Sequence, residues 1–208
     1  MIAMPEKIRR WTGPLLGGLA VVLLALLWLS PAERSLGQTV KLVYLHGALV
    51  RTAMVLFAVS LPANLVALVG GRDTWLAWGK ALTWAAVLVW LVHTLFSIVT
   101  TYAAWGVFIA WFEPRTRFTF ALALVAVVIL AVAWLVGNAR FSAFTFILLA
   151  GLTLGLAPRL GAVQHPLNAI RLSPSGAIRS FYTAIWLICL AMGGLLALWL
   201  RGRLDPDR

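Results

Sequence analysis

The sequence is poor in charged residues, above all in acidic ones. Charged residues make up 11% of 208 positions, and only six are Asp or Glu against 17 Lys or Arg. Soluble domains carry about 25% charged residues, so this chain cannot cover a soluble surface. Cys189 is the single cysteine, which excludes an intrachain disulfide and a cysteine-based metal site. What is abundant is apolar: 62% of residues, with a mean hydropathy of +0.97, which predicts a polytopic membrane protein.

Signatures of common enzyme classes are also missing. The sequence has no Gly-rich phosphate loop, no His-Glu-x-x-His, no nucleophile elbow and no paired carboxylates inside an apolar run. We therefore expect no enzyme activity. Proton-coupled transporters usually carry buried carboxylates along their pathway, and the apolar runs contain none.

The net charge of +11 does not predict nucleic-acid binding. The basic residues are scattered among loops and helix ends and form no stripe interleaved with aromatic residues. Their spacing is typical of side chains that anchor helix ends at anionic lipid headgroups.

Six apolar stretches are long enough to cross a hydrocarbon core, which takes about 20 helical residues. Backbone groups in lipid must be satisfied internally, so such runs predict helices. The sequence predicts an all-α fold: one membrane domain over residues 1–208, a six-transmembrane-helix bundle with a surface Trp-rich loop. The expected spans are 13–30, 46–69, 76–99, 118–136, 141–158 and 181–200.

Two of these spans carry features of their own. The first follows Lys7, Arg9 and Arg10 like a signal peptide, but its apolar run is long and no Ala-x-Ala site follows, so we expect an uncleaved helix. The fifth contains Gly151 and Gly155 at the small-xxx-small spacing, which favours close helix packing.

Charge alone barely orients the bundle. If the N-terminus is cytoplasmic, nine basic residues lie on that side and eight on the other. The basic cluster before the first span favours both termini in the cytoplasm under the positive-inside rule. Eight basic residues outside are more than the positive-inside rule predicts, and this excess would suit an anionic ligand on that side.

Two of the three histidines flank predicted spans on the same side of the membrane. His46 opens the second span, and His165 precedes Pro166 in the loop after the fifth. His93 instead lies deep in the third span, where an ionisable residue is costly and often functional. A hydrogen bond from His93 to a neighbouring helix is the structural alternative.

An aromatic segment, residues 105–117, lies between the two flanking histidines in the sequence. Read as a helix on the membrane surface, it places 105, 108 and 112 on one face and 106, 110, 113 and 117 on another, with Pro114 ending or bending it. The alternative is an ordinary belt of interfacial aromatic residues.

Imidazoles beside an aromatic loop suit a flat, apolar, iron-containing cofactor. Neutral imidazole is a regular axial ligand of haem iron, and His46 and His165 are the candidates. Arg115 or Arg117 would pair with the haem propionates. Arg51 is about 140° around the helix from His46, so it would meet a propionate or a neighbouring helix instead.

This arrangement resembles the cytochrome c assembly family, specifically its CcmC-like haem-handling proteins. The likeness runs over residues 35–200 and rests on three stretches: 37–46, ending in Tyr-Leu-His; 104–115, with Ala-Trp-Gly and Trp-Phe-Glu-Pro-Arg; and 165–168, His-Pro-Leu-Asn. The family loop has a Trp-Gly-x-x-Trp-x-Trp-Asp-like run. Here two tryptophans remain, Phe108 and Phe112 supply ring surface, and Glu113 stands where the aspartate is expected.

The resemblance implies a function for these residues. His46 and His165 would be axial ligands of a transiently bound haem b, and Trp105, Gly106 and Trp111 would line the haem platform on the extracytoplasmic face of the inner membrane. Such proteins present haem to a membrane-anchored haem chaperone for cytochrome c maturation, in some systems with an ABC-type ATPase complex.

Two other functions remain open from the residues themselves. A permease subunit for a small or lipid-like substrate would use His93, Arg51 or Lys80 at membrane depth. A structural subunit of a membrane complex would need neither histidine nor haem.

Overall fold

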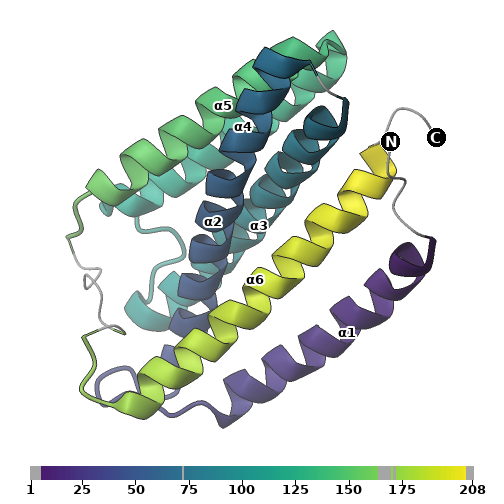
Figure 1. The fold of residues 1–208 in the computed structure, drawn as a ribbon. Helices are drawn as coiled ribbons and strands as arrows, with labels where there is room; N and C mark the ends of the chain where they lie inside the picture. The colour runs from purple at the N-terminus through teal and green to yellow at the C-terminus, as the bar shows by residue number, and fades with distance from the viewer. Residues whose placement is uncertain (1–5, 72, 164–169, 171, 205–208) are drawn as a thin grey trace.

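The structure is a computed structural model and describes residues 6–71, 73–163, 170 and 172–204 (Figure 1). Within these residues no β-strand forms, and an isolated bridge pairs Glu33 with Gly37. The predicted all-α bundle of six membrane-length helices is confirmed. The helices are α1 (Glu6–Leu29), α2 (Val40–Gly70), α3 (Asp73–Trp105), α4 (Pro114–Val136), α5 (Ala139–Leu156) and α6 (Gly176–Leu204), with a 3₁₀ turn, η1 (Ala157–Arg159), after α5.

Several helices are longer than their apolar runs. α2 and α3 have 31 and 33 residues, well above the roughly 20 that span the hydrocarbon. α2 begins at Val40, six residues before the predicted start, so His46 lies inside the helix and not at its opening. Hydropathy marks where lipid begins, and a helix continues past that point wherever its backbone bonds can form.

Successive helices run in opposite directions through the bundle. As a result the connections 30–39, 106–113 and 157–163 gather at one end, at the lower left of Figure 1. We call this the loop end. The short turns after α2 and α4 lie at the opposite end.

A polar network fastens α2 to α3 near their shared turn. The Asn64 amide donates to the Ser60 carbonyl at 2.9 Å and to Thr83 Oγ1 at 3.1 Å, and Thr83 Oγ1 donates to the Gly79 carbonyl at 2.8 Å. Gly79 must be glycine, because a Cβ there would lie 2.8 Å from Asn64 Cγ. This network supplies the polar bonds that hold membrane helices together where no hydrophobic driving force acts.

The core has two parts, and α6 contributes to both. The larger one joins α2, α3, α4, α5 and the second half of α6 around Phe57, Trp90 and Phe146. The smaller one joins the start of α2 to α6 around Tyr44 and Tyr182, and α1 packs onto it. α1 rests mainly on α6 and stands apart from the other helices (Figure 1).

Candidate functional site at the loop end

His46 lies in the α2–α3 interface, about 9 Å along the helix from Val40 at 1.5 Å per residue. Its half-buried imidazole contacts that of His93 on α3, with ring centroids 4.4 Å apart and planes inclined at 39°. The structure therefore brings together two histidines that the sequence placed at different depths and gave different roles.

His93 is enclosed, with 2% of its surface exposed. The Trp90 ring meets it edge-on at 5.5 Å, and Trp90 Nε1 donates to the Thr119 carbonyl of α4 at 3.1 Å. A row of rings thus runs from His46 on α2 through α3 to α4. His93 thus contacts a neighbouring helix through its ring, against the candidate ligand itself, and the hydrogen bond expected as its structural alternative stays a prediction.

Buried hydroxyls lead from His93 toward the loop end. Thr94, Ser97 and Thr100 follow one face of α3 and donate to carbonyls of their own helix, at 2.8, 2.6 and 3.0 Å. Because these bonds satisfy the hydroxyls locally, the row costs little to bury. It makes the α3 face above His93 more polar than the surrounding bundle.

The segment 106–113 is an irregular loop, so the predicted surface helix over 105–117 is wrong. α3 ends at Trp105 because Gly106 adopts a left-handed conformation, with φ of 73°, and its N–H closes on the Tyr102 carbonyl at 2.9 Å. Pro114 does not end a helix but begins α4, where its fixed φ suits the first turn. Gly106 therefore has a backbone role in addition to its predicted place on the platform.

The loop's aromatic rings form separate pairs and not one helical face. The ring centroids of Trp105 and Phe112 are 6.4 Å apart. Phe108 stacks on Tyr102, with ring centroids 4.5 Å apart and planes inclined at 12°. Trp111 pairs with Phe120 on α4 at 5.3 Å and remains 54% exposed. Phe108 and Phe112 are exposed as well. The loop end thus offers several flat apolar rings at its surface.

Glu113 is the residue whose importance the sequence understated. Its side chain is 1% exposed, and both carboxylate oxygens accept from the Val163 N–H at 3.1 Å. This contact ties the aromatic loop to the chain after η1. The sequence signals were modest: one of six acids, placed among aromatic residues and directly before a proline.

His165 and the rest of 164–169 lie outside the described residues, as does Arg171. Val163, which Glu113 holds, precedes His165 by two positions in the sequence. Of the predicted site residues, the described part of the loop end includes Trp105, Gly106 and Trp111, whereas His46 lies inside α2 against His93 of α3.

The three arginines considered as partners of an anionic ligand differ in their contacts. The Arg51 guanidinium lies over the Tyr182 ring of α6 at 5.0 Å, so its neighbouring-helix alternative is realised. Arg115 is half-buried, and within the described residues its Nε is buried with no hydrogen-bond partner. Arg117 is exposed. Arg115 is thus the better placed of the two to receive an anionic group.

Glu33 shows how the α1–α2 connection is ordered. Its carboxylate accepts from the Ser35 hydroxyl at 2.5 Å, the Ser35 N–H at 2.8 Å and the Leu36 N–H at 2.9 Å. These bonds, led by the Ser35 side chain, hold the pKa of Glu33 below its usual 4.5. Unlike Glu113, Glu33 bonds only within its own connection in these contacts.

The paired imidazoles do not fit opposite sides of one iron. Bonds of about 2 Å from a metal to each of two trans imidazoles separate the ring centroids by about 6 Å. The observed 4.4 Å is too short. A haem bound at His46 would need its second axial ligand from elsewhere, which is the role predicted for His165, and the exposed rings and Arg115 suit the haem's faces and propionates.

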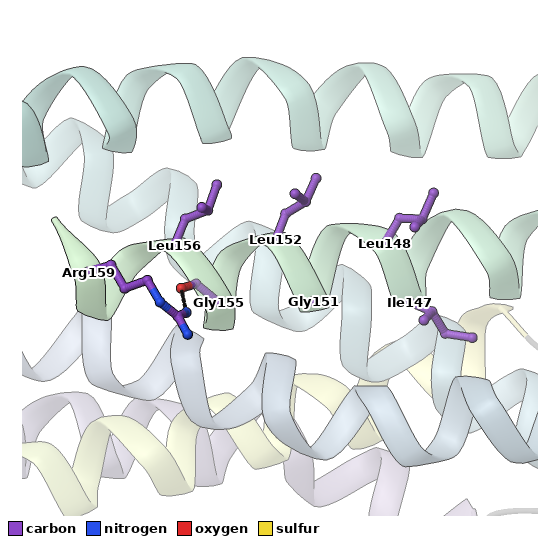
Figure 2. Close-up of a pocket in the computed structure, with 7 residues that line it drawn as sticks. All are labelled: Ile147, Leu148, Gly151, Leu152, Gly155, Leu156 and Arg159. Carbon is purple, nitrogen blue, oxygen red and sulfur yellow. Dashed lines mark hydrogen bonds between the residues drawn. The ribbon is translucent and has the colours of Figure 1, made fainter.

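A separate apolar notch lies on the outer face of α5, shown in Figure 2. It is an open hollow of about 500 Å³, lined by residues of α5 from Ile147 onward and by Arg159 of η1, and includes no predicted site residue. The Arg159 guanidinium folds back onto the Gly155 carbonyl. Among the described residues nothing lies within 4 Å of a Cβ placed on Gly151, so the expected helix packing at this motif is not made.

The fold and composition define a multi-pass, six-helix membrane protein with an aromatic loop end. No known protein-family model matches the chain, and no curated protein sequence shows significant similarity to it.

Proposed function

We propose that this chain binds haem at its loop end and presents it, on the extracytoplasmic face of the inner membrane, for cytochrome c maturation. The proposal extends the resemblance of its three motifs to the CcmC-like haem-handling proteins. By that analogy the haem is a cargo, handed to a membrane-anchored chaperone with other maturation subunits.

The contact of Glu113 with Val163 is the observation that carries the proposal. Two segments 50 residues apart, one aromatic and one leading to His165, are fastened together by a buried carboxylate. A buried charge is costly unless hydrogen-bonded, so it is expected where two loops must keep a fixed relation. The three motifs of the resemblance would then meet at one end of the bundle.

The chemistry of the described residues suits this ligand. Exposed Trp111, Phe108 and Phe112 offer ring surface to a flat conjugated molecule. His46 offers an imidazole to iron, and Arg115 a cation to a propionate. The remaining axial ligand in the proposal is His165.

The test is haem titration into detergent-purified protein, followed by absorption. We expect a Soret band that is perturbed in both His46→Ala and His165→Ala, because each variant removes one axial ligand. Leu65→Ala, a change of a lipid-facing residue on the same helix as His46, is the matched control and should leave the spectrum unchanged.

Wild-type spectra in both histidine variants would refute the ligand assignment. Transport of a small substrate by haem-free protein in proteoliposomes would favour the permease alternative. Recovery of a membrane complex that is indifferent to both histidine changes would favour a structural subunit.

A further inference from the structure

The pair of imidazoles in the α2–α3 interface has a role that the haem proposal leaves unassigned. We propose that His93 is a positioning residue that sets the orientation and tautomer of His46, and so tunes the iron that His46 binds. This inference rests on the proposed function for its consequence at iron, but the positioning itself concerns the protein alone.

The first support is geometric. With ring centroids 4.4 Å apart and planes inclined at 39°, His93 occupies one side of the His46 ring and limits its rotation toward α3. This spacing also excludes the two rings as trans ligands of one metal, as shown above. His93 therefore lies beside the candidate ligand, on its protein side.

The second support is that His93 is itself held in place. It is 2% exposed and contacts the edge of Trp90 at 5.5 Å. Trp90 is anchored in turn by its bond to the Thr119 carbonyl and by the Phe118 ring at 6.1 Å. Since Thr119 and Phe118 belong to the first turns of α4, directly after the aromatic loop, the row of rings connects the loop to His46.

The third support is chemical. A neutral imidazole has one N–H donor and one acceptor nitrogen, so a nitrogen of His93 that faces a nitrogen of His46 would favour the complementary tautomer there. Residues that fix the ring orientation and tautomer of a metal-ligating histidine change its basicity and the properties of the metal. A buried, immobile His93 has the chemistry for that role.

Three substitutions separate positioning from mere packing. His93→Phe keeps a ring and removes both nitrogens, and His93→Gln restores one donor and one acceptor. Thr94→Ala is the matched control, since it removes a neighbouring buried polar group whose hydroxyl, among the described residues, bonds to the Trp90 carbonyl of its own helix.

The primary measurement needs no haem. In ¹⁵N-histidine NMR spectra of the apo protein, we expect the His46 tautomer signals to shift in His93→Phe, to return toward wild type in His93→Gln, and to stay unchanged in Thr94→Ala. In haem-loaded protein, His93→Phe should also shift the reduction potential and the ligand-field spectrum without releasing the haem.

Unchanged His46 signals in His93→Phe, or a Gln variant no closer to wild type than Phe, would overturn the inference. Should His93→Phe fail to fold, His93→Leu against Thr94→Ala makes the same comparison with the same deciding outcomes. Wild-type protein that takes up no haem would refute the proposed function, and the apo spectra would then decide the positioning role by themselves.

Discussion

Gly79 is the position where a single added carbon matters most clearly. It lies in the α2–α3 interface, where the absence of a side chain lets Asn64 reach both the Gly79 and Thr83 acceptors. A methyl group at this position would displace the amide and break bonds that have no water to replace them. The α2–α3 pair positions His46 against His93, so this one glycine also governs the register of the candidate site.

We expect Gly79→Ala to lower the free energy of unfolding by about 1–3 kcal/mol, the usual cost of overpacking a filled interior. The control is Gly194→Ala on α6, where no atom of the described residues lies within 4 Å of the added carbon. That change should be neutral or slightly stabilising, because Ala favours helix over Gly. Thermal unfolding of both variants in the same detergent measures the difference, and equal midpoints would contradict the packing argument.

Individual residues also mark the limit of what the sequence could predict. His46, His93 and Glu113 were all noticed for their chemistry, but their partners depend on the register between helices far apart in sequence. The contact of His46 with His93 depends on the axial alignment of α2 with α3, and the hydropathy of the sequence does not determine that alignment. Placing Glu113 against Val163 required knowing that α5 returns the chain to the same end of the bundle.

At the scale of helices and loops, the apolar runs predicted each helix but not its ends. α2 and α3 continue beyond their apolar runs because extending an existing helix adds one backbone hydrogen bond for each residue fixed, without a new nucleation cost. The loop 106–113 shows the opposite error: its aromatic spacing imitates an amphipathic helix, whereas Gly106 and Pro114 fix its two ends by backbone conformation. In this segment the residues that end α3 and begin α4 determine the backbone, and the spacing of the aromatic residues does not.

The aromatic loop gives a prediction at this scale. Glu113→Ala removes the acceptor of the Val163 N–H, and a hydrogen bond to a charged group is worth about 1.5–3 kcal/mol. We expect haem affinity to fall about tenfold, since 1.4 kcal/mol corresponds to a factor of ten. Haem titration monitored by absorption measures this loss.

Glu33→Ala is the matched control for that experiment. It removes another loop-end carboxylate, but one that bonds to Ser35 and Leu36 within its own connection. An equal loss of haem affinity in both variants would show that negative charge at the loop end matters, and not the joining of the two segments.

For the whole molecule, the arrangement of six alternating helices predicts a labelling pattern. In a Cys189→Ser background, Val107→Cys places a thiol at the loop end, and Arg140→Cys places one at the opposite end; both positions are exposed. With the proposed orientation, an impermeant maleimide should label Val107→Cys in right-side-out vesicles and Arg140→Cys in inverted ones. The reverse pattern would place the loop end in the cytoplasm and contradict presentation of haem outside.

The position of α1 has a consequence for the order in which the molecule is built. α1 is synthesised before α6, yet the surface on which it mainly rests belongs to α6. Until α6 is made, α1 must therefore persist in lipid with few helix contacts, those with the start of α2. Its composition makes this possible, because residues 13–29 contain no charged side chain and are well solvated by lipid acyl chains. Docking of α1 onto α6 would then follow the assembly of α2 to α5, which precede α6 in the chain.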